Sequence, residues 1–450
     1  MATNYVVGPT RALTALDQVP WERLQAGDQV AIDWRPQPYA AKWVVCARGT
    51  QDAPIVIRGL KSPKGQLPVI DGRNAITRPV LDFWNANRAV IKIGGANVPA
   101  DRVPAHIVIQ DVEIRSARPA YRFIGRRGIQ QYRSDASAIY IEKGESITIR
   151  GCRLLDSGNG LLVAPQCRSI LIEACYIADN GIVGSFYEHN AYTEALGVTF
   201  QGNRFGPLRK GCRGNAIKDR SAGTVIRYNW IEGGNRQLDL VEAEEGKHLR
   251  SSPYYRQTYV YGNVLIEHDG AGNNQIVHYG GDNGQTHTYR KGTLHFYHNT
   301  VVSYRQGTTT LFRLSTDDEM VDCRNNIFHV AAAGRIGLLD ETGILRLDTN
   351  WMKKGWRPSF SSPTAKVLGD ETTIEGESPG FVDAKALDFT LKSTSPCRDS
   401  GGLLNARVSF GGGKVTHQYL LHQGLGPRPE SGKKDLGAFE FLEETSRRAP

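Results

Sequence analysis

One short phrase recurs eight times along the chain, and it constrains the fold more than any other feature of the sequence. Each copy sets a polar or small residue among apolar ones, as in residues 201–205 (QGNRF) and 261–265 (YGNVL). Neighbouring copies lie between 23 and 41 residues apart, a spacing typical of solenoids whose units stack on one another. The central residues of the copies are Asp111, Cys152, Cys175, Asn203, Asn229, Asn263, Asn299 and Asn326.

This period predicts an all-β fold, a right-handed parallel β-helix with long loop insertions. Coils of such a fold stack at strand spacing, about 4.8 Å, so the central residues are expected to form ladders. The five asparagines are expected at a tight bend, where asparagine tolerates unusual dihedral angles and its amide can bond the backbone. Cys152 and Cys175 are expected to be stacked neighbours, as free, buried thiols.

The fold is expected to run through the whole chain. Residues 1–330 are predicted to form the β-helix with the catalytic loops, and residues 331–450 to form carboxyl-terminal coils and an irregular segment of the same solenoid. Strands are read from short apolar runs bounded by glycine, asparagine and aspartate, such as 147–149 and 170–172.

Charge and cysteine content exclude several classes of protein. Lysine and arginine exceed aspartate and glutamate by nine, but they are scattered, so no nucleic-acid surface is predicted. No apolar run approaches the roughly 18 residues that a bilayer requires, so no membrane insertion is expected. The seven cysteines form no CxxC pair, so neither a zinc site nor a disulfide framework is indicated.

The amino terminus lacks the basic and apolar regions of a signal peptide. The protein is therefore expected to be secreted or periplasmic with its leader already removed, or cytoplasmic if the chain is complete as given.

Four polar clusters fall in the part of the chain with the longest insertions. Loops on a rigid solenoid carry function more often than its coils do, and seven of the eleven histidines lie here. Because the clusters fall on successive coils, they are expected to converge along one side of the solenoid as a groove. The clusters are residues 187–192 (YEHNAY), 209–221 (RKGCRGNAIKDRS), 239–245 (DLVEAEE) and 277–282 (VHYGGD).

A groove with bases, cations and carboxylates suits an extended acidic glycan. In β-elimination on a uronic acid, the enzyme must neutralise the carboxylate, remove the C5 proton and help the 4-oxygen to leave. Lys218 lies between Arg213 and Arg220, and neighbouring positive charge favours the neutral amine that a base requires.

Both ends of the chain resemble known proteins. Residues 21–60 resemble the opening coils of bacterial β-helix proteins of the pectate-lyase-like superfamily, and residues 379–383, 395–401 and 435–440 resemble their last coils. With the central repeats, the resemblance covers nearly the whole chain and implies the β-helix fold.

A narrower resemblance concerns one motif. Residues 215–220 (NAIKDR), followed by 224–229 (TVIRYN), resemble the stretch of alginate lyases and chondroitinase B whose lysine is the Brønsted base. This resemblance implies that Lys218 is the base. Those lyases hold calcium with glutamates five and seven residues before the lysine, where this chain has Arg213 and Gly211, and residues 241–243 (VEA) replace their Arg-His-Gly.

The resulting prediction is a bacterial polysaccharide lyase acting on an acidic polysaccharide. The family's calcium site is not carried over, and Arg209, Lys210 and Arg213 are candidates to neutralise the substrate in its place. A calcium ion held by Glu188, Glu194, Glu242 or Glu244 stays open. The predicted catalytic residues are Lys218, Arg220, His189 and Tyr192, and the predicted substrate-binding residues are Tyr187, Asn190, Arg209, Arg213, Asp239, Glu242, His278 and Tyr279.

Three alternatives remain open. A glycoside hydrolase on the same fold needs two carboxylates, drawn from Asp239, Glu242 and Asp282. An epimerase shares the proton-abstraction step. A non-catalytic glycan-binding spike or adhesin can use stacking tyrosines, for which the candidates are Tyr254, Tyr255, Tyr259, Tyr261, Tyr289 and Tyr297.

Overall fold

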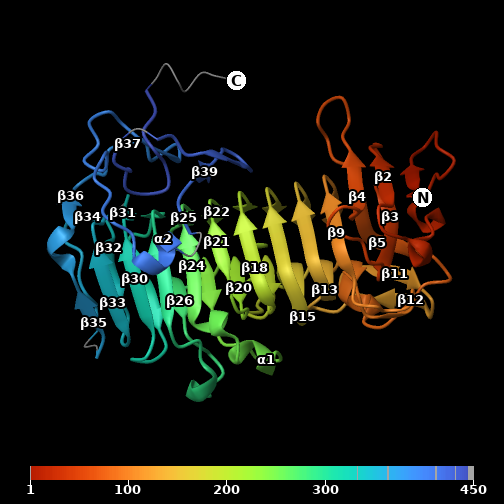
Figure 1. Cartoon of the computed structure of the whole chain (residues 1–450), viewed down its shortest axis with the longest axis horizontal. Coiled ribbons are helices and arrows are strands. Elements are labelled where there is room, and N and C mark those ends of the chain that lie inside the picture. Colours follow the sequence, from red (N-terminus) through yellow and green to blue (C-terminus); the bar gives the residue numbers. More distant parts are fainter. Residues whose placement is uncertain (1, 332, 362–363, 411–412, 431, 444–450) are drawn as a thin grey trace. The chain divides into compact units, whose positions relative to one another are not determined.

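The computed structural model describes residues 2–331, 333–361, 364–410, 413–430 and 432–443. These residues form two compact units. Unit 1 contains the described residues of 1–199, 205–221 and 244–249, and unit 2 contains those of 200–204, 222–243 and 250–450. In each unit, strands pair in parallel with strands one coil further along the chain, so each unit is a parallel β-helix (Figure 1).

Unit 1 contains three stacks of parallel strands. The first comprises β1 (Asn4–Val7), β2 (Gln29–Asp33), β4 (Ile55–Leu60), β9 (Ala105–Gln110) and the second halves of β13 (Ser137–Arg150) and β15 (Asn159–Glu173). The second comprises β3 (Tyr39–Val45), β7 (Ala89–Ile93), the first halves of β13 and β15, β17 (Ala191–Thr193) and β20 (Ile217–Asp219). The third comprises β5 (Val69–Thr77), β10 (Glu113–Arg115), β14 (Arg153–Leu155) and β16 (Tyr176–Ile177).

Isoleucine ladders form the core of unit 1. Ile57, Ile109, Ile149 and Ile172 occupy equivalent positions on β4, β9, β13 and β15, and all four are fully buried. Successive side chains of a strand point to opposite faces, so the residues between the ladder positions face outward. Branched apolar side chains that repeat at strand spacing pack on one another. Each coil is therefore stabilised by its contact with the neighbouring coils.

Unit 1 also contains short strands that form antiparallel pairs. β6 (Asp82–Phe83) pairs with β8 (Ala96–Val98), and β11 (Arg122–Gly125) forms a hairpin with β12 (Gly128–Gln131). Three elements have some residues in the range of unit 1 and the others in the range of unit 2. They are the strands β18 (Leu196–Gln201) and β19 (Arg204–Phe205) and the helix α1 (Lys247–Arg250).

Unit 2 also contains three parallel stacks. One comprises β21 (Val225–Arg227), β24 (Gln257–Tyr261), β27 (Thr293–Tyr297), β30 (Met320–Arg324), β33 (Ile344–Asp348) and β35 (Lys366–Leu368). The next comprises β23 (Leu238–Leu240), β26 (Gln275–Tyr279), β29 (Thr308–Leu314) and β32 (Arg335–Leu339). The last comprises β22 (Trp230–Glu232), β25 (Val264–Glu267), β28 (Thr300–Ser303), β31 (Ile327–Val330), β34 (Trp351–Lys353) and β36 (Ile374–Gly376).

The segment after β36 is less regular. It contains the antiparallel pairs β37 (Phe381–Asp383) with β38 (Asp388–Leu391) and β39 (His417–Tyr419) with β40 (Leu425–Pro427), together with the short helix α2 (Ala406–Phe410). It packs on the coils of unit 2, because Phe389 and Tyr419 stack on Trp230.

The predicted asparagine ladder is present in unit 2. From Asn229 onward, the Oδ1 of each ladder residue accepts hydrogen bonds from the backbone N–H and the side-chain amide of the ladder asparagine one coil earlier, at 2.8 to 3.2 Å. The ladder also includes Asn350, which the repeat analysis missed. Its members are Asn203, Asn229, Asn263, Asn299, Asn326 and Asn350, all fully buried.

Two further expectations can be compared with the structure. Cys152 and Cys175 are free and fully buried, as predicted, and burial raises the pKa of the Cys175 thiol. Among the described residues, no helix is long and apolar enough to cross a membrane.

The ladder predicts a strong effect of substitution at its centre. Asn263→Ala removes bonds to Asn229 and Asn299 and leaves buried backbone groups without partners, so we expect a loss of about 2 to 4 kcal/mol in the free energy of unfolding. Urea unfolding followed by circular dichroism measures this free energy. The exposed Asn97→Ala serves as the control, and equal midpoints for the two variants would contradict the structural role of the ladder.

Candidate functional site

A row of large side chains runs along the outward face of the second stack of unit 1. Strand register places Lys92, Tyr140, Leu162, Tyr192 and Lys218 side by side on β7, β13, β15, β17 and β20. On the opposite face of the same strands, the side chains are buried and mostly apolar, and the exceptions Thr193 and Asp219 share a hydrogen bond of 2.7 Å. The row therefore collects basic and aromatic groups that are far apart in the sequence.

Lys218 and Tyr192 are direct register partners, and Arg220 joins them. Arg220 Nε donates a hydrogen bond of 3.0 Å to the Tyr192 hydroxyl, and its Nη2 lies 3.2 Å from Glu244 Oε2. Lys218 and Arg220 are only 9% and 5% exposed. The structure thus brings together three of the four predicted catalytic residues, Lys218, Arg220 and Tyr192.

The Tyr192 phenol keeps its proton at neutral pH. Burial raises its pKa above the ordinary value, and this effect outweighs the opposing influence of the Arg220 and Lys218 charges. The hydroxyl is therefore a proton donor, while the Arg220 guanidinium is placed to stabilise negative charge on its oxygen.

His189 lies against Tyr192 with its ring edge-on, at 5.7 Å between ring centres. Its Nδ1 accepts a hydrogen bond of 2.9 Å from the backbone N–H of Asn215. Because an accepting nitrogen carries no proton, the neutral ring has its proton on Nε2. The fourth predicted catalytic residue is therefore placed as a hydrogen-bond donor rather than a base.

Other predicted residues of the first cluster have different surroundings. Tyr187 is 82% exposed. Asn190 is fully buried, where its amide donates to the Gly206 carbonyl and accepts from Asn180. Asn190 thus bonds other parts of the coil, and it presents no surface to a substrate.

Arg209 and Arg213 also differ from each other. Arg209 lies 2.9 Å from Asp156 and donates to the carbonyls of Asp179 and Gly181, so its charge is used within the fold. Arg213 is exposed, with its guanidinium 5.1 Å from the ring centre of Phe186. Of the two, Arg213 is the one that a substrate can reach.

The predicted calcium ligands are dispersed. Glu188 is buried, with its Oε2 lacking a hydrogen-bond partner among the described residues. Glu194 accepts a hydrogen bond of 2.6 Å from Gly246 N–H, and burial raises its pKa to about 6. Glu244 is half-exposed and pairs with Arg220. Within the part of the chain that the structure describes, no three acidic, histidine or cysteine residues are grouped to hold a metal.

In unit 2, the predicted residues fall on both faces of one stack. Asp239 and His278 are register partners on β23 and β26, with 2.7 Å between Asp239 Oδ1 and His278 Nδ1. Tyr279, the next residue, points inward and is fully buried. Glu242 is also fully buried and accepts the N–H groups of Asp282 and Asn283, an arrangement that holds the loop after β26.

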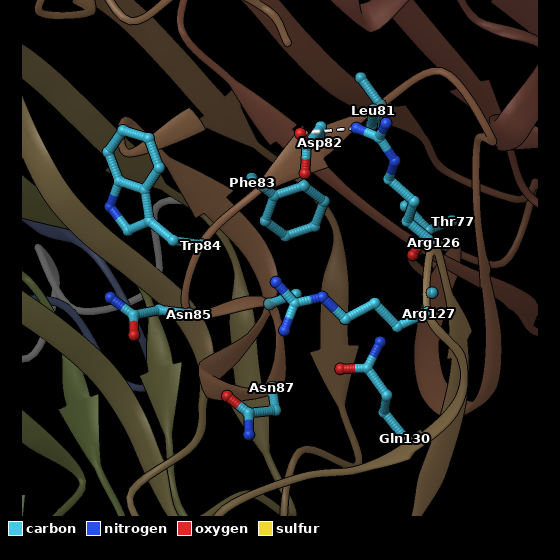
Figure 2. Close-up of a pocket in the computed structure, with 12 residues that line it drawn as sticks. Thr77, Leu81, Asp82, Phe83, Trp84, Asn85, Asn87, Arg126, Arg127 and Gln130 are labelled. Atoms are coloured by element: carbon cyan, nitrogen blue, oxygen red, sulfur yellow. Dashed lines mark ion pairs between the residues drawn. The ribbon is translucent and has the colours of Figure 1, made fainter. Parts of the chain in front are cut away.

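Sequence reasoning missed two features. One is Ser315, whose Oγ lies 2.9 Å from His278 Nε2; no motif surrounds it in the sequence. The other is a pocket of about 240 Å³ in unit 1, on the loop that carries β6. Figure 2 shows the Arg127 side chain reaching across this pocket between Phe83 and Asn87, with Trp84 on one side and Gln130 on the other.

Buried lysines hold the loop of this pocket. Lys92 Nζ donates to the Trp84 carbonyl at 2.7 Å and lies 2.8 Å from Glu142, which accepts the indole N–H of Trp84. Lys42 Nζ donates to the carbonyls of Ala86 and Ala89. The pocket is therefore preformed, with an indole that is 40% exposed.

Comparisons with known proteins agree with this fold. Residues 105–231 match the family model described as "Right handed beta helix region". The crystal structure of pectate lyase Pel9A is similar with a TM-score of 0.52 and 11% identity, over 98% of this chain and 97% of that chain. The prediction of a right-handed parallel β-helix is therefore confirmed.

Two other solved structures are more distant. An alginate lyase from Paenibacillus sp. has a TM-score of 0.44 and 12% identity, over 78% of this chain and 93% of that chain. The PL6 family polysaccharide lyase Pedsa3628 from Pseudopedobacter saltans has a TM-score of 0.34 and 11% identity, over 84% and 95%. A comparison with curated proteins found no match.

The raised pKa of Glu194 predicts a pH-dependent effect on stability. A carboxyl whose pKa rises from 4.5 to about 6 on folding stabilises the protein below pH 4.5, and this contribution is lost as the pH rises through 6. Glu194→Gln stays neutral, so relative to the wild type we expect it to gain up to about 2 kcal/mol between pH 4.5 and pH 8. Thermal unfolding at both pH values measures this. The exposed Asp52→Asn should show no such change, and a pH-independent effect of Glu194→Gln would contradict the burial argument.

Proposed function

We propose that this protein is a polysaccharide lyase that cleaves an acidic, uronic-acid-containing glycan by β-elimination. The observation that carries the proposal is the cluster of Lys218, Tyr192 and Arg220 on neighbouring strands of unit 1. It places an amine, a protonated phenol and a guanidinium within one small region. These are the groups that the elimination requires.

The proposed steps assign one role to each group. Lys218, as the neutral amine, takes the C5 proton, and the electron pair forms the C4–C5 double bond while the C4–O bond breaks. Tyr192 gives its proton to the departing oxygen, and Arg220 stabilises the resulting phenolate through its Nε–H. Lys218 is only 9% exposed and is the register partner of Tyr192, so base and acid stand on neighbouring strands.

Two further cations and one donor complete the proposal. We assign to the exposed Arg213 the neutralisation of the substrate carboxylate, which must occur before C5 becomes acidic. His189 supports the site as a donor from Nε2, because its Nδ1 is engaged by the Asn215 N–H. Arg127, in the pocket of Figure 2, offers a second cation for an acidic sugar.

The pocket suits a saccharide. Its exposed indole offers a flat apolar face, and Asn85, Asn87 and Gln130 supply amides that can bond hydroxyl groups. We therefore propose it as a glycan subsite. The fold supports a lyase because a pectate lyase is built on it, and an acidic polysaccharide as substrate favours a secreted or periplasmic bacterial protein.

The hydrolase alternative has less support from the geometry. Two of its three candidate carboxylates, Asp239 and Glu242, are buried and hydrogen-bonded to His278 and to the backbone of the loop after β26, and only Asp282 is exposed. For the adhesin alternative, three of the six candidate tyrosines, Tyr255, Tyr261 and Tyr297, are buried and offer no stacking surface, whereas Tyr254 is exposed.

The first test of the proposal is elimination itself. A panel of uronic-acid polysaccharides is screened for the ultraviolet absorbance of the 4,5-unsaturated product. On the substrate so identified, we expect Lys218→Ala to lower kcat by about 10² to 10⁴-fold with little change in KM, because proton transfer is lost while binding is kept. Tyr192→Phe, which removes only the hydroxyl, should also lower kcat.

The matched control is Lys64→Ala, which removes an exposed lysine of unit 1. Full activity of Lys218→Ala would overturn the base assignment. The same assay with a chelator tests the open question of calcium: retained activity supports arginine as the charge neutraliser, and loss of activity restored by calcium would show that a metal does this work.

The subsite predicts a different signature. Trp84→Ala removes the apolar face of the pocket, so we expect oligosaccharide binding to weaken by about tenfold, with kcat nearly unchanged. Calorimetric titration with product oligosaccharides measures the affinity. Trp356→Ala, a tryptophan outside the pocket, is the control, and unchanged affinity in Trp84→Ala would refute the subsite.

A further inference from the structure

A hydrogen-bonded chain of three side chains in unit 2 is not used by the proposed elimination. Asp239 Oδ1 lies 2.7 Å from His278 Nδ1, and His278 Nε2 lies 2.9 Å from Ser315 Oγ. Asp239 and His278 are register partners on β23 and β26, and Ser315 directly follows β29. Both distances fall in the range for an acid, a base and a nucleophile that act together.

The hydrogen bonds fix where the protons lie. A carboxylate only accepts, so the Nδ1 that faces Asp239 carries the single proton of the neutral ring. Nε2 then carries no proton and is an acceptor for the Ser315 hydroxyl at 2.9 Å. That hydroxyl has one proton and also donates to the Gly281 carbonyl at 2.9 Å, so the proposed attack requires its proton to turn toward His278. That orientation prepares the serine to lose its proton.

Burial favours the same state of the ring. Asp239 and His278 are each 2% exposed, and burial lowers the pKa of His278 below its ordinary value despite the neighbouring carboxylate. The imidazole is therefore a neutral base at pH 7. Ser315, in contrast, is only half-buried, so it is the most exposed residue of the three.

We propose that Ser315, His278 and Asp239 form an ester-cleaving site that removes short acyl groups from hydroxyl-bearing molecules such as sugars. Ser315 Oγ attacks the ester carbonyl while its proton passes to His278 Nε2. The intermediate collapses, and the alcohol leaves with that proton. Water then attacks the acyl-serine, gives a proton to His278 and releases the acid, after which Ser315 regains its proton.

The surroundings supply charge stabilisation and limit the size of the acyl group. Arg313 is the register partner of His278 on β29 and is exposed, so its cation can stabilise an oxyanion beside Ser315. The Gly281 N–H donates to Ser315 Oγ at 2.9 Å. A Cβ on Gly280 would lie 2.6 Å from that oxygen, so the loop backbone packs closely against Ser315, which favours a small acyl group in the proposed site.

The inference is tested with the full chain and a fluorophosphonate, a reagent that reacts covalently with activated serines. We expect one adduct per molecule, located on Ser315 by peptide mass mapping, and a measurable hydrolysis of p-nitrophenyl acetate. Ser315→Ala should abolish both. Asp239→Asn, which permits the wrong tautomer of His278, should lower the labelling rate at least 100-fold. Circular dichroism verifies that each variant is folded.

Two controls separate the possible outcomes. Ser361→Ala, at an exposed serine, should label like the wild type. Lys218→Ala should lose elimination and keep ester cleavage, so a failure of one proposal does not imply failure of the other. Absence of any adduct on Ser315 in the folded wild-type protein, or equal labelling of wild type and Asp239→Asn, would overturn the inference. Mapping of the wild type decides the question even if Ser315→Ala does not fold.

Discussion

Parallel register between successive coils is the constraint on which the rest of the structure depends. Each strand takes its hydrogen bonds from the strand one coil earlier and gives them to the next, so a side chain's direction is set by its position in the rung. The fully buried Ile57, Ile109, Ile149 and Ile172 show the inward consequence. Lys92, Tyr192 and Lys218, on the other face, show the outward one.

In the candidate site, this register places ionisable side chains at positions that are nearly buried. Lys218 and Arg220 are both nearly buried beside the Tyr192 phenol, and burial is the largest influence that raises the pKa of this phenol. In bulk water such charges interact weakly, and in a site of low dielectric they interact strongly. The stacking of coils therefore brings several ionisable side chains, on neighbouring strands, into one small region. One strand alone would hold such residues farther apart.

Part of the fold and of the candidate site can be predicted from the sequence, because repeated backbone geometry selects repeated residues. Asn203 to Asn326 were recognisable because one backbone bend recurs in every coil and selects the same residue each time. Asn350 fits the same phrase, since residues 350–352 (NWM) parallel residues 229–231 (NWI), and the ladder extends one coil further than predicted. Lys218 and Tyr192 were both identified as candidates, and their register partnership required the coil lengths that only the structure gives.

Other features could not be read from the sequence. Asn190 and Arg209 look like substrate contacts in a linear chain, yet the fold uses them to bond its own backbone. Both lie outside the strands, where no alternation of polar and apolar residues tells inside from outside. Ser315 has no flanking motif, and its significance depends on His278, which lies 37 residues away. The pocket beside Trp84 depends on buried lysines whose charge would ordinarily argue for exposure.

The asparagine ladder also bears on the chemical ageing of the molecule. Asparagine is thermolabile because the amide nitrogen of the following residue can attack its side chain and close a succinimide ring. Here the nitrogens of Trp230, Val264, Thr300 and Ile327 are each bonded to a carbonyl one coil earlier, and the side-chain oxygens are bonded as well. Deamidation would require both partners to leave the rung together, so residues that would be weak points in a loop become durable in the stack.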